Sequence, residues 1–249
     1  MSAEADVKLQ DFENIFKLDG KVAVVTGGSR GLGLHAASGL LQAGCSQVYI
    51  TSRKASGCEQ AVLALNALPN KQPHAVAISV PADLSKVSEI ERLAAEIGKQ
   101  TPHIDILFAN AGATWGERFE THPEPAFSKV MDLNVKSVFY TIQKLEPLLP
   151  ARAPAAAIHL TKNLAVELAP RHILCNAIAP GFYPSKMANG LMELEGGEEK
   201  LAQMSPNQRL GHPEDVAGLV VFLASRAAAH LNGTVIATDG GAVLARGRL

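Results

Sequence analysis

The chain has 249 residues, of which 47% are hydrophobic and 19% are charged. Because 23 Lys and Arg nearly balance 24 Asp and Glu, no broad positive field is available to bind nucleic acid or an anionic membrane. No apolar run approaches the roughly 18 residues of a membrane span, and residues 1–20 lack the hydrophobic segment of a signal peptide. Cys45, Cys58 and Cys175 are isolated thiols, which predicts neither a disulfide framework nor a metal site. We expect a soluble, cytoplasmic protein.

Short β-branched runs alternate along the chain with amphipathic segments of helical length. Strands are predicted at 22–26, 47–51, 74–80 and 104–109, and helices at 32–42, 58–68 and 85–100. Strands separated by helices predict right-handed crossovers and a doubly wound parallel sheet of the Rossmann-like α/β class. Ligands bind such sheets beyond the carboxyl ends of the strands. We expect a leader at 1–17 and a single dinucleotide-binding domain at 18–249, with its site in the loops after the strands.

A glycine-rich loop joins the first predicted strand to the first helix. It reads Thr26-Gly27-Gly28-Ser29-Arg30-Gly31-Leu32-Gly33. Glycines let the backbone approach a pyrophosphate, and the helix N-terminus offers free N–H donors. A P-loop is excluded because no Lys-Ser or Lys-Thr follows the last glycine, and a turn without ligand is the simpler alternative. The TGxxxGxG spacing resembles the short-chain dehydrogenase/reductase family, which implies that Gly27, Ser29, Arg30, Gly31, Leu32 and Gly33 contact the cofactor.

The end of the second strand predicts which dinucleotide is preferred. It reads Thr51-Ser52-Arg53-Lys54, and no acid occurs before Glu59 to bind a ribose 2′-hydroxyl. Arg30, Ser52 and Arg53 instead offer charge-assisted donors suited to a 2′-phosphate, which favours NADP(H) over NAD(H). The alternative is that these are surface cations at a strand end.

Further motifs extend the resemblance over about residues 18–243. In the family, Asp83 would meet the adenine, although a residue of this type also caps helices. Asn134 matches the asparagine that helps to hold a proton-relay water, although it could instead face solvent. The remaining cofactor residues implied by the resemblance are Asn110, Ala111 and Gly112 after the fourth strand, and Pro180, Gly181, Tyr183 and Ser185 on the nicotinamide side.

The family's catalytic Ser and its YxxxK pair have no counterpart at the expected position. Tyr140 and Lys144 have the literal spacing, but they lie on the helix that follows the fourth strand instead of the next one. Pro150-Ala151-Arg152-Ala153-Pro154 replaces a whole strand before a helix that begins at Ala155. The six Cα steps from Leu149 to Ala155 reach at most about 21 Å, whereas the preceding helix descends about 22 Å from the cofactor edge. We expect a sheet missing or rearranged at the fifth strand, from mis-splicing or in a degenerate paralogue.

The function that the resemblance implies is NADP(H)-dependent oxidation or reduction of a small-molecule carbonyl or hydroxyl group. A lid at 187–204 with several apolar residues suggests a 3-oxoacyl-type substrate; the alternative is that those residues serve packing of the lid. The alternative is a catalytically silent NADPH-binding subunit. The family also implies a homo-oligomer. The ending Gly247-Arg248-Leu249 is close to the SKL address, so peroxisomal residence is the alternative to a cytoplasmic one.

Overall fold

The computed structural model describes residues 11–148, 157–184 and 188–245. Four parallel strands form a sheet in the order β3-β2-β1-β4. These are β1 (Val22–Thr26), β2 (Gln47–Thr51), β3 (Val76–Ser79) and β4 (Ile106–Phe108), connected by α2 (Gly31–Gln42), α3 (Ala55–Asn66) and α4 (Val87–Gly98). The structure confirms the predicted succession of strands and helices and the predicted doubly wound α/β class. The ends of several elements differ by two or three residues from the expected ones, because apolar patterns locate segments better than they locate caps.

The core lies on both faces of this sheet. Every residue of β1 is buried, because β1 is central and helices cover it on each side. On one face, Leu40 and Leu41 of α2 pack with Val216 and Val220 of α10 (Pro213–Ala224). On the other face the cluster is formed by Ile90, Leu93 and Ile97 of α4 with Leu145 of α6 (Ser137–Leu145). These two layers hold the carboxyl ends of the strands at one common edge.

A second, two-stranded sheet follows later in the chain. Its strands β5 (Ala177–Pro180) and β6 (Val235–Thr238) are parallel and pair Ala177 with Val235. Within the described residues, no strand joins β4 to β5, so the two sheets remain separate. The residues of β4 are only half-buried, in contrast to β1. This division agrees with the prediction of a sheet interrupted at its fifth strand.

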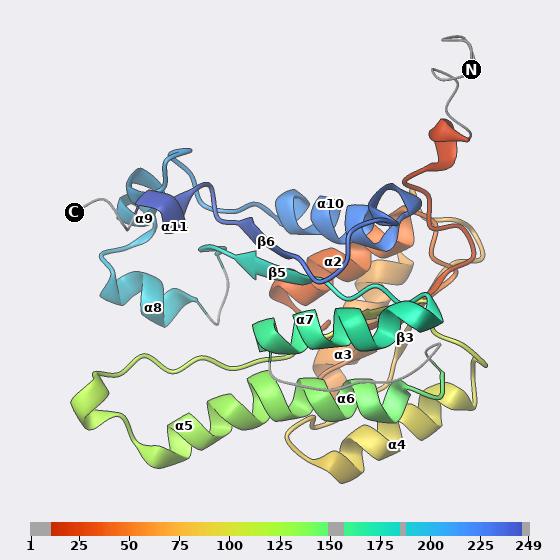
Figure 1. The fold of residues 1–249 in the computed structure, drawn as a ribbon, viewed down its shortest axis with the longest axis horizontal. Coiled ribbons are helices and arrows are strands. Elements are labelled where there is room, and N and C mark those ends of the chain that lie inside the picture. Colours follow the sequence, from red (N-terminus) through yellow and green to blue (C-terminus); the bar gives the residue numbers. More distant parts are fainter. Residues whose placement is uncertain (1–10, 149–156, 185–187, 246–249) are drawn as a thin grey trace.

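The helices before and after residues 149–156 lie beside the division between the two sheets. They are η2 (Phe119–Thr121), α5 (Glu124–Met131), the π-helix η3 (Asp132–Lys136), α6, α7 (Ala157–Leu168) and η4 (Ala169–Arg171). Figure 1 shows α7 beside α6, with α5 extending away from the sheet. The Leu148 carbonyl accepts the Ile104 N–H at 2.9 Å, so the chain after α6 has descended to the amino end of β4. The predicted helix start at Ala155 lies outside the described residues.

The remaining elements are η1 (Phe12–Asn14), α8 (Asn189–Leu194), α9 (Glu198–Met204), η5 (Arg226–Ala228) and α11 (Ala242–Ala245). Helices α8 and α9 fall in the segment expected to form a lid. Met192 and Leu201 of that segment are buried, so their side chains serve packing. None of the described helices is long and apolar enough to span a membrane.

Candidate cofactor and active site

The glycine-rich loop forms a tight cradle between β1 and α2. Gly27 and Gly31 have φ values of 65° and 54°, in the left-handed region that favours glycine. A Cβ on Gly33 would lie 2.5 Å from the Gly27 carbonyl oxygen and 2.6 Å from the Asn110 amide nitrogen. Gly33 is therefore required for close packing of the loop on the first turn of α2. The first N–H groups of α2 remain available for an anion at this turn.

Thr26 connects this loop to the end of β4. Its hydroxyl oxygen accepts the backbone N–H groups of Asn110 and Ala111, both at 2.9 Å. The Asn110 side-chain amide donates to the Thr26 carbonyl at 3.0 Å. Asn110 thus holds two strand ends together and does more than turn the chain. The threonine at the end of β1 was missed among the predicted site residues, although its place directly before Gly27 was visible.

A cavity of about 1950 Å³ runs from this loop into the space between the two sheets, and we call it the central cavity. The predicted residues that line it are Gly27, Ser29, Arg30, Gly31, Leu32, Ser52, Arg53, Asn110, Ala111, Gly112, Asn134 and Pro180. The structure therefore brings together side chains that are widely separated in the sequence. This includes every residue that the sequence assigned to a 2′-phosphate.

The electrostatics of the central cavity favour an anion on the side of α2. Among the described residues that line it, Asp105 is the only acid, and its carboxylate is paired with Lys21 at 2.7 Å. Burial acts to raise the pKa of Asp105, but hydrogen bonds from Lys21 and the Val22 N–H outweigh it and the pKa is lowered. Arg30 and Arg53 are exposed, and no ion pair found in the described part of the chain engages them. Both guanidinium groups are available to a phosphate.

Several predicted cofactor residues do not line the central cavity. Thr51 is 1% exposed and its hydroxyl has no partner, while its carbonyl accepts the Gly28 N–H at 3.3 Å. Asp83 accepts hydrogen bonds from the Ser85 N–H and hydroxyl in the turn before α4, and no side chain caps the N-terminus of that helix, so the capping role of the simpler alternative is not observed. A Cβ on Gly181 would lie 2.8 Å from Asp239, so this glycine permits close packing. Thr51 and Asp83 therefore hold the backbone beside the cavity, and Gly181 leaves room for Asp239.

Tyr183 and Ser185 complete the predicted nicotinamide side. Tyr183 is buried in the core cluster of α2 and α10, and its hydroxyl is 2.9 Å from the Thr238 hydroxyl. It faces a smaller cavity of about 730 Å³, together with His35 and Arg209. Ser185 lies outside the described residues.

Asn134 lies in the π-helix between α5 and α6. A π-turn inserts one extra residue into a helix and often marks a functional position. The Asn134 amide oxygen accepts the Ala113 N–H at 2.8 Å, and its nitrogen donates to the Ala113 carbonyl at 2.9 Å. This side chain holds the loop after β4 in place, which a freely solvated asparagine would not do.

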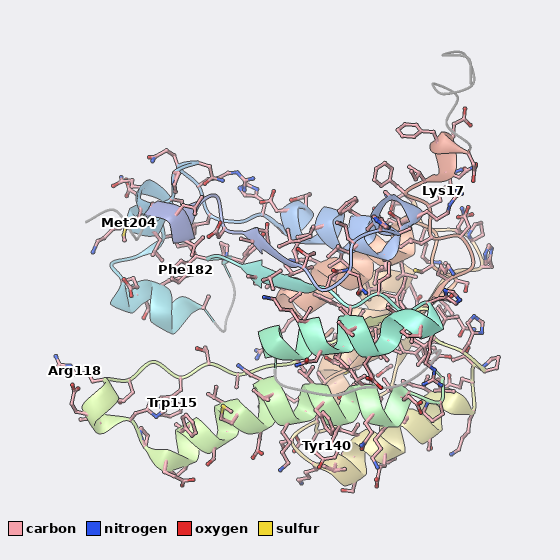
Figure 2. All side chains as sticks on the ribbon, viewed as in Figure 1. Lys17, Trp115, Arg118, Tyr140, Phe182 and Met204 are labelled. Atoms are coloured by element: carbon pink, nitrogen blue, oxygen red, sulfur yellow. The ribbon has the colours of Figure 1, made fainter. Side chains whose placement is uncertain are left out.

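None of the three tyrosines of the chain lines the central cavity. Tyr49 is buried in β2. Tyr140 lies on the side of α6 that packs against α4, and it is labelled in Figure 2. Lys144 is paired with Glu91 of α4 at 2.8 Å. The pair with the literal YxxxK spacing therefore faces α4, in agreement with its rejection. Over the residues that the structure describes, no group of His, Cys, Asp or Glu side chains is arranged to hold a metal.

The fold and this loop geometry define the chain as a dinucleotide-binding α/β protein. Two family models match it: short chain dehydrogenase at residues 21–155, and enoyl-(acyl carrier protein) reductase at residues 150–243. The chain belongs to the short-chain dehydrogenase/reductase family. The two matches meet at residues 150–155, where the sequence predicts a missing segment.

Individual relatives cover nearly the whole chain. A rhamnolipids biosynthesis 3-oxoacyl-[acyl-carrier-protein] reductase of Pseudomonas aeruginosa is 38% identical over 91% of this chain and 97% of that protein. The 2-dehydro-3-deoxy-D-gluconate 5-dehydrogenase of Escherichia coli is 34% identical over 91% of this chain and 96% of its own length. The solved Pseudomonas aeruginosa RhlG/NADP active-site complex superposes with a TM-score of 0.82 at 36% identity, covering 92% of this chain and 98% of that chain. The solved structure of a short-chain type dehydrogenase/reductase of Mycobacterium marinum superposes with a TM-score of 0.82 at 26% identity, covering 92% of this chain and 98% of that chain.

Proposed function

We propose that this chain is an NADP(H)-dependent oxidoreductase that acts on a carbonyl or hydroxyl group, with a 3-oxoacyl-type substrate. The observation that carries the cofactor assignment is the pair of unengaged guanidinium groups, Arg30 and Arg53, beside Ser52 in a cavity whose only acid among the described lining residues, Asp105, is paired with Lys21. The solved NADP complex of a similar protein supports the same cofactor. NADPH, when bound, supplies the hydride for reduction of a carbonyl.

The chain's own residues would hold this cofactor along the edge of the sheet. The glycine cradle and the first turn of α2 would receive the pyrophosphate, and Arg30, Ser52 and Arg53 the 2′-phosphate. We propose that Asp83 and Thr51 shape the adenine side from behind. Asn110, Ala111 and Gly112 with Pro180 and Gly181 would bound the nicotinamide, with Tyr183 behind them. Ser185 stays a proposed contact of the nicotinamide side. Asn134, which braces Ala113, would hold a water there.

The substrate class is proposed from the similar Pseudomonas aeruginosa reductase, whose name gives a 3-oxoacyl substrate. A carbonyl that accepts hydride becomes an alkoxide and needs a proton. No tyrosine hydroxyl reaches the central cavity to supply it. That observation favours the second candidate function, a subunit that binds NADPH with little or no turnover.

The origin of this deficiency is proposed to be a missing segment. The alignment with the Pseudomonas aeruginosa relative spans 256 positions although it uses 91% of a 249-residue chain, so it contains gaps on the side of this chain. The junction of the two family matches at residues 150–155 supports the same position. Sequencing the transcript across this junction tests it, because an in-frame strand with a Ser and YxxxK would identify this form as mis-spliced.

Cofactor binding is tested by titrating the purified protein with NADPH and NADH. We expect tighter binding of NADPH. Arg53→Ala should weaken NADPH by about 1.5–3 kcal/mol through loss of a charge-assisted hydrogen bond, with little effect on NADH. Arg118→Ala is the control, because this exposed arginine lies far from the cavity on the segment before α5 (Figure 2). Tighter NADH binding, or equal losses for both dinucleotides, would overturn the assignment.

The organisation of the chain is part of the proposal. We propose one domain at 18–249, supported by a core cluster that joins Leu18 to Val220. We further propose a homo-oligomer, as is usual in the family, and cytoplasmic residence. A fluorescent fusion at the N-terminus, which leaves Leu249 free, would reveal peroxisomal residence instead.

A further inference from the structure

The first turns of α3 place a buried thiol directly behind the proposed 2′-phosphate site. Cys58 is 0% exposed and belongs to the core cluster on the α2 face of the sheet. Its Sγ atom lies 3.3 Å from the Ser52 Oγ atom and 3.7 Å from the Ser52 carbonyl oxygen. Both polar contacts of the thiol are therefore with one residue, and that residue lines the central cavity together with Arg53.

The backbone around Ser52 is fixed by hydrogen bonds. The Ser52 carbonyl accepts the Ala82 N–H at 3.1 Å, and the Thr51 carbonyl accepts the Gly28 N–H at 3.3 Å. The freedom that remains to Ser52 is rotation of its side chain and of its hydroxyl proton. For that hydroxyl, the Cys58 sulfur is the one hydrogen-bond partner found among the described residues. Cys58 is therefore placed to decide where the Ser52 hydroxyl points.

The two side chains carry one proton each, and either can donate in their contact. A phosphate group near neutral pH offers mainly acceptor oxygens, so the Ser52 hydroxyl binds one by donating its proton. The hydroxyl oxygen then keeps lone pairs that can accept the thiol proton of Cys58. Because sulfur is a weak acceptor, the hydroxyl loses little when its proton turns from Cys58 to a phosphate.

Packing is the simpler explanation for this cysteine, because a free Cys is commonly buried as a small hydrophobic residue. Cys45 has that role. It is 0% exposed in the same cluster, and its thiol makes no hydrogen bond within the part of the chain that the structure describes. It precedes β2 at the amino end, whereas Ser52 follows β2 at the carboxyl end. Cys45 is therefore a matched control for the loss of a buried thiol.

We propose that Cys58 is a positioning residue that directs the Ser52 hydroxyl toward the 2′-phosphate and so contributes to the preference for NADPH over NADH. The inference rests on the proposed function, because it requires a 2′-phosphate at Ser52. Cys58 is fully buried and is not among the residues that line the central cavity, so it acts through Ser52 and not by contact with the cofactor.

Titrations of Cys58 variants with NADPH and NADH separate hydrogen bonding from packing. Cys58→Val keeps most of the side-chain volume and loses the donor, whereas Cys58→Ser keeps a donor and loses volume. We expect Cys58→Val and Cys58→Ala to weaken NADPH about three- to tenfold and NADH less than about twofold. Cys58→Ser should stay within about twofold of the parent for both dinucleotides.

The matched controls are Cys45→Val and Cys45→Ser, which should leave both affinities unchanged. If packing alone accounts for Cys58, the order of its variants reverses: Cys58→Ser binds NADPH more weakly, and Cys58→Val binds it normally. That order would overturn the positioning role. NADH binding retained in Cys58→Val shows that the variant is folded, and Cys58→Ala takes its place if it is not.

Removing the Ser52 hydroxyl tests whether Cys58 acts through it. In a Ser52→Ala background, Cys58→Ala should cause no further loss of NADPH affinity, because the two substitutions remove one shared interaction. Fully additive losses would contradict the proposal. The S–H stretching band of Cys58, obtained as the infrared difference between the parent and Cys58→Ala, gives a second readout. It should move to lower wavenumber when NADPH binds, because the thiol then donates to Ser52; an unmoved band is the opposite result.

Arg53→Ala separates this inference from the cofactor assignment. If Arg53→Ala weakens NADPH selectively while Cys58→Val and Cys58→Ala bind normally, the cofactor assignment stands and the positioning role is overturned. If Arg53→Ala, Ser52→Ala and Cys58→Val all leave the ratio of NADPH to NADH affinity unchanged, the 2′-phosphate does not bind at this strand end, and both proposals are wrong.

Discussion

Thr26 and Asn110 exchange hydrogen bonds between the ends of two adjacent strands. The Thr26 hydroxyl accepts the Asn110 N–H at 2.9 Å, and the Asn110 side chain donates to the Thr26 carbonyl at 3.0 Å. The strand ends that bear the glycine cradle and the loop after β4 are thereby fixed to one another. The shape of the candidate cofactor site depends on this connection.

Thr26→Val should destabilise the protein by about 1–3 kcal/mol, because two backbone N–H groups lose their acceptor while the side-chain shape is kept. Urea unfolding measures this change. Thr51→Val is the matched control in the adjacent strand, since the Thr51 hydroxyl is buried without a partner and its removal should be neutral or stabilising. Equal destabilisation by the two changes would show that β-strand packing, and not the hydroxyl of Thr26, accounts for the loss.

Gly33→Ala should abolish measurable NADPH binding and lower the melting temperature. The new Cβ would lie 2.5 Å from the Gly27 carbonyl oxygen, so the cradle must open. In Gly218→Ala the added Cβ meets nothing within 4 Å, and α10 should gain up to about 1 kcal/mol from the better helix former. Calorimetry with and without NADPH measures both. Normal NADPH affinity in Gly33→Ala would show that the loop is not the pyrophosphate site.

Turnover of 3-oxoacyl or simple ketone substrates should be at least about a hundredfold slower than in a family member with an intact catalytic tyrosine, the low end of general acid–base contributions. The three tyrosines of this chain lie away from the cavity. NADPH oxidation followed by absorbance measures the rate. Tyr140→Phe should leave that rate unchanged, since Tyr140 packs against α4. Robust turnover that this substitution removes would show that Tyr140 and Lys144 act in catalysis after all.

The ion pair between Asp215 and Arg209 should make stability depend on acid pH. The hydrogen bond from Arg209, helped by the His212 N–H, lowers the pKa of Asp215 from 3.8 to about 2. Because the folded-state pKa is the lower one, the stabilisation is present above about pH 4 and is lost as pH falls through about 2. Both side chains are partly exposed, so solvent screening limits the effect to about 1 kcal/mol. Melting temperatures of the parent and Asp215→Asn should differ at pH 6 and converge near pH 2; a constant difference would contradict the assignment.

The sequence by itself predicted the sheet and the glycine-rich loop, and it contains no Ser and YxxxK at the place where the family would have them. Buried parallel strands appear in the sequence as continuous β-branched runs, as at 22–26. Glycines mark positions where the backbone must lie close to a neighbouring segment or a ligand. The preference for a 2′-phosphate was also visible, because it depends on which charges occur at one strand end. A missing YxxxK could be recognised because its place is defined by neighbouring motifs.

Only the tertiary structure decided which of the predicted residues line the cavity. Thr51, Asp83 and Tyr183 belong to the predicted site, but their side chains do not line the cavity. They point into the sheet, a turn and the core, respectively, because the orientation of a side chain depends on packing partners far away in the chain. The pairing of Asn134 with Ala113 and of Lys144 with Glu91 likewise required the folded chain. The space between β4 and β5 lies between two segments that are far apart in the sequence, so no local pattern could have predicted which residues line it.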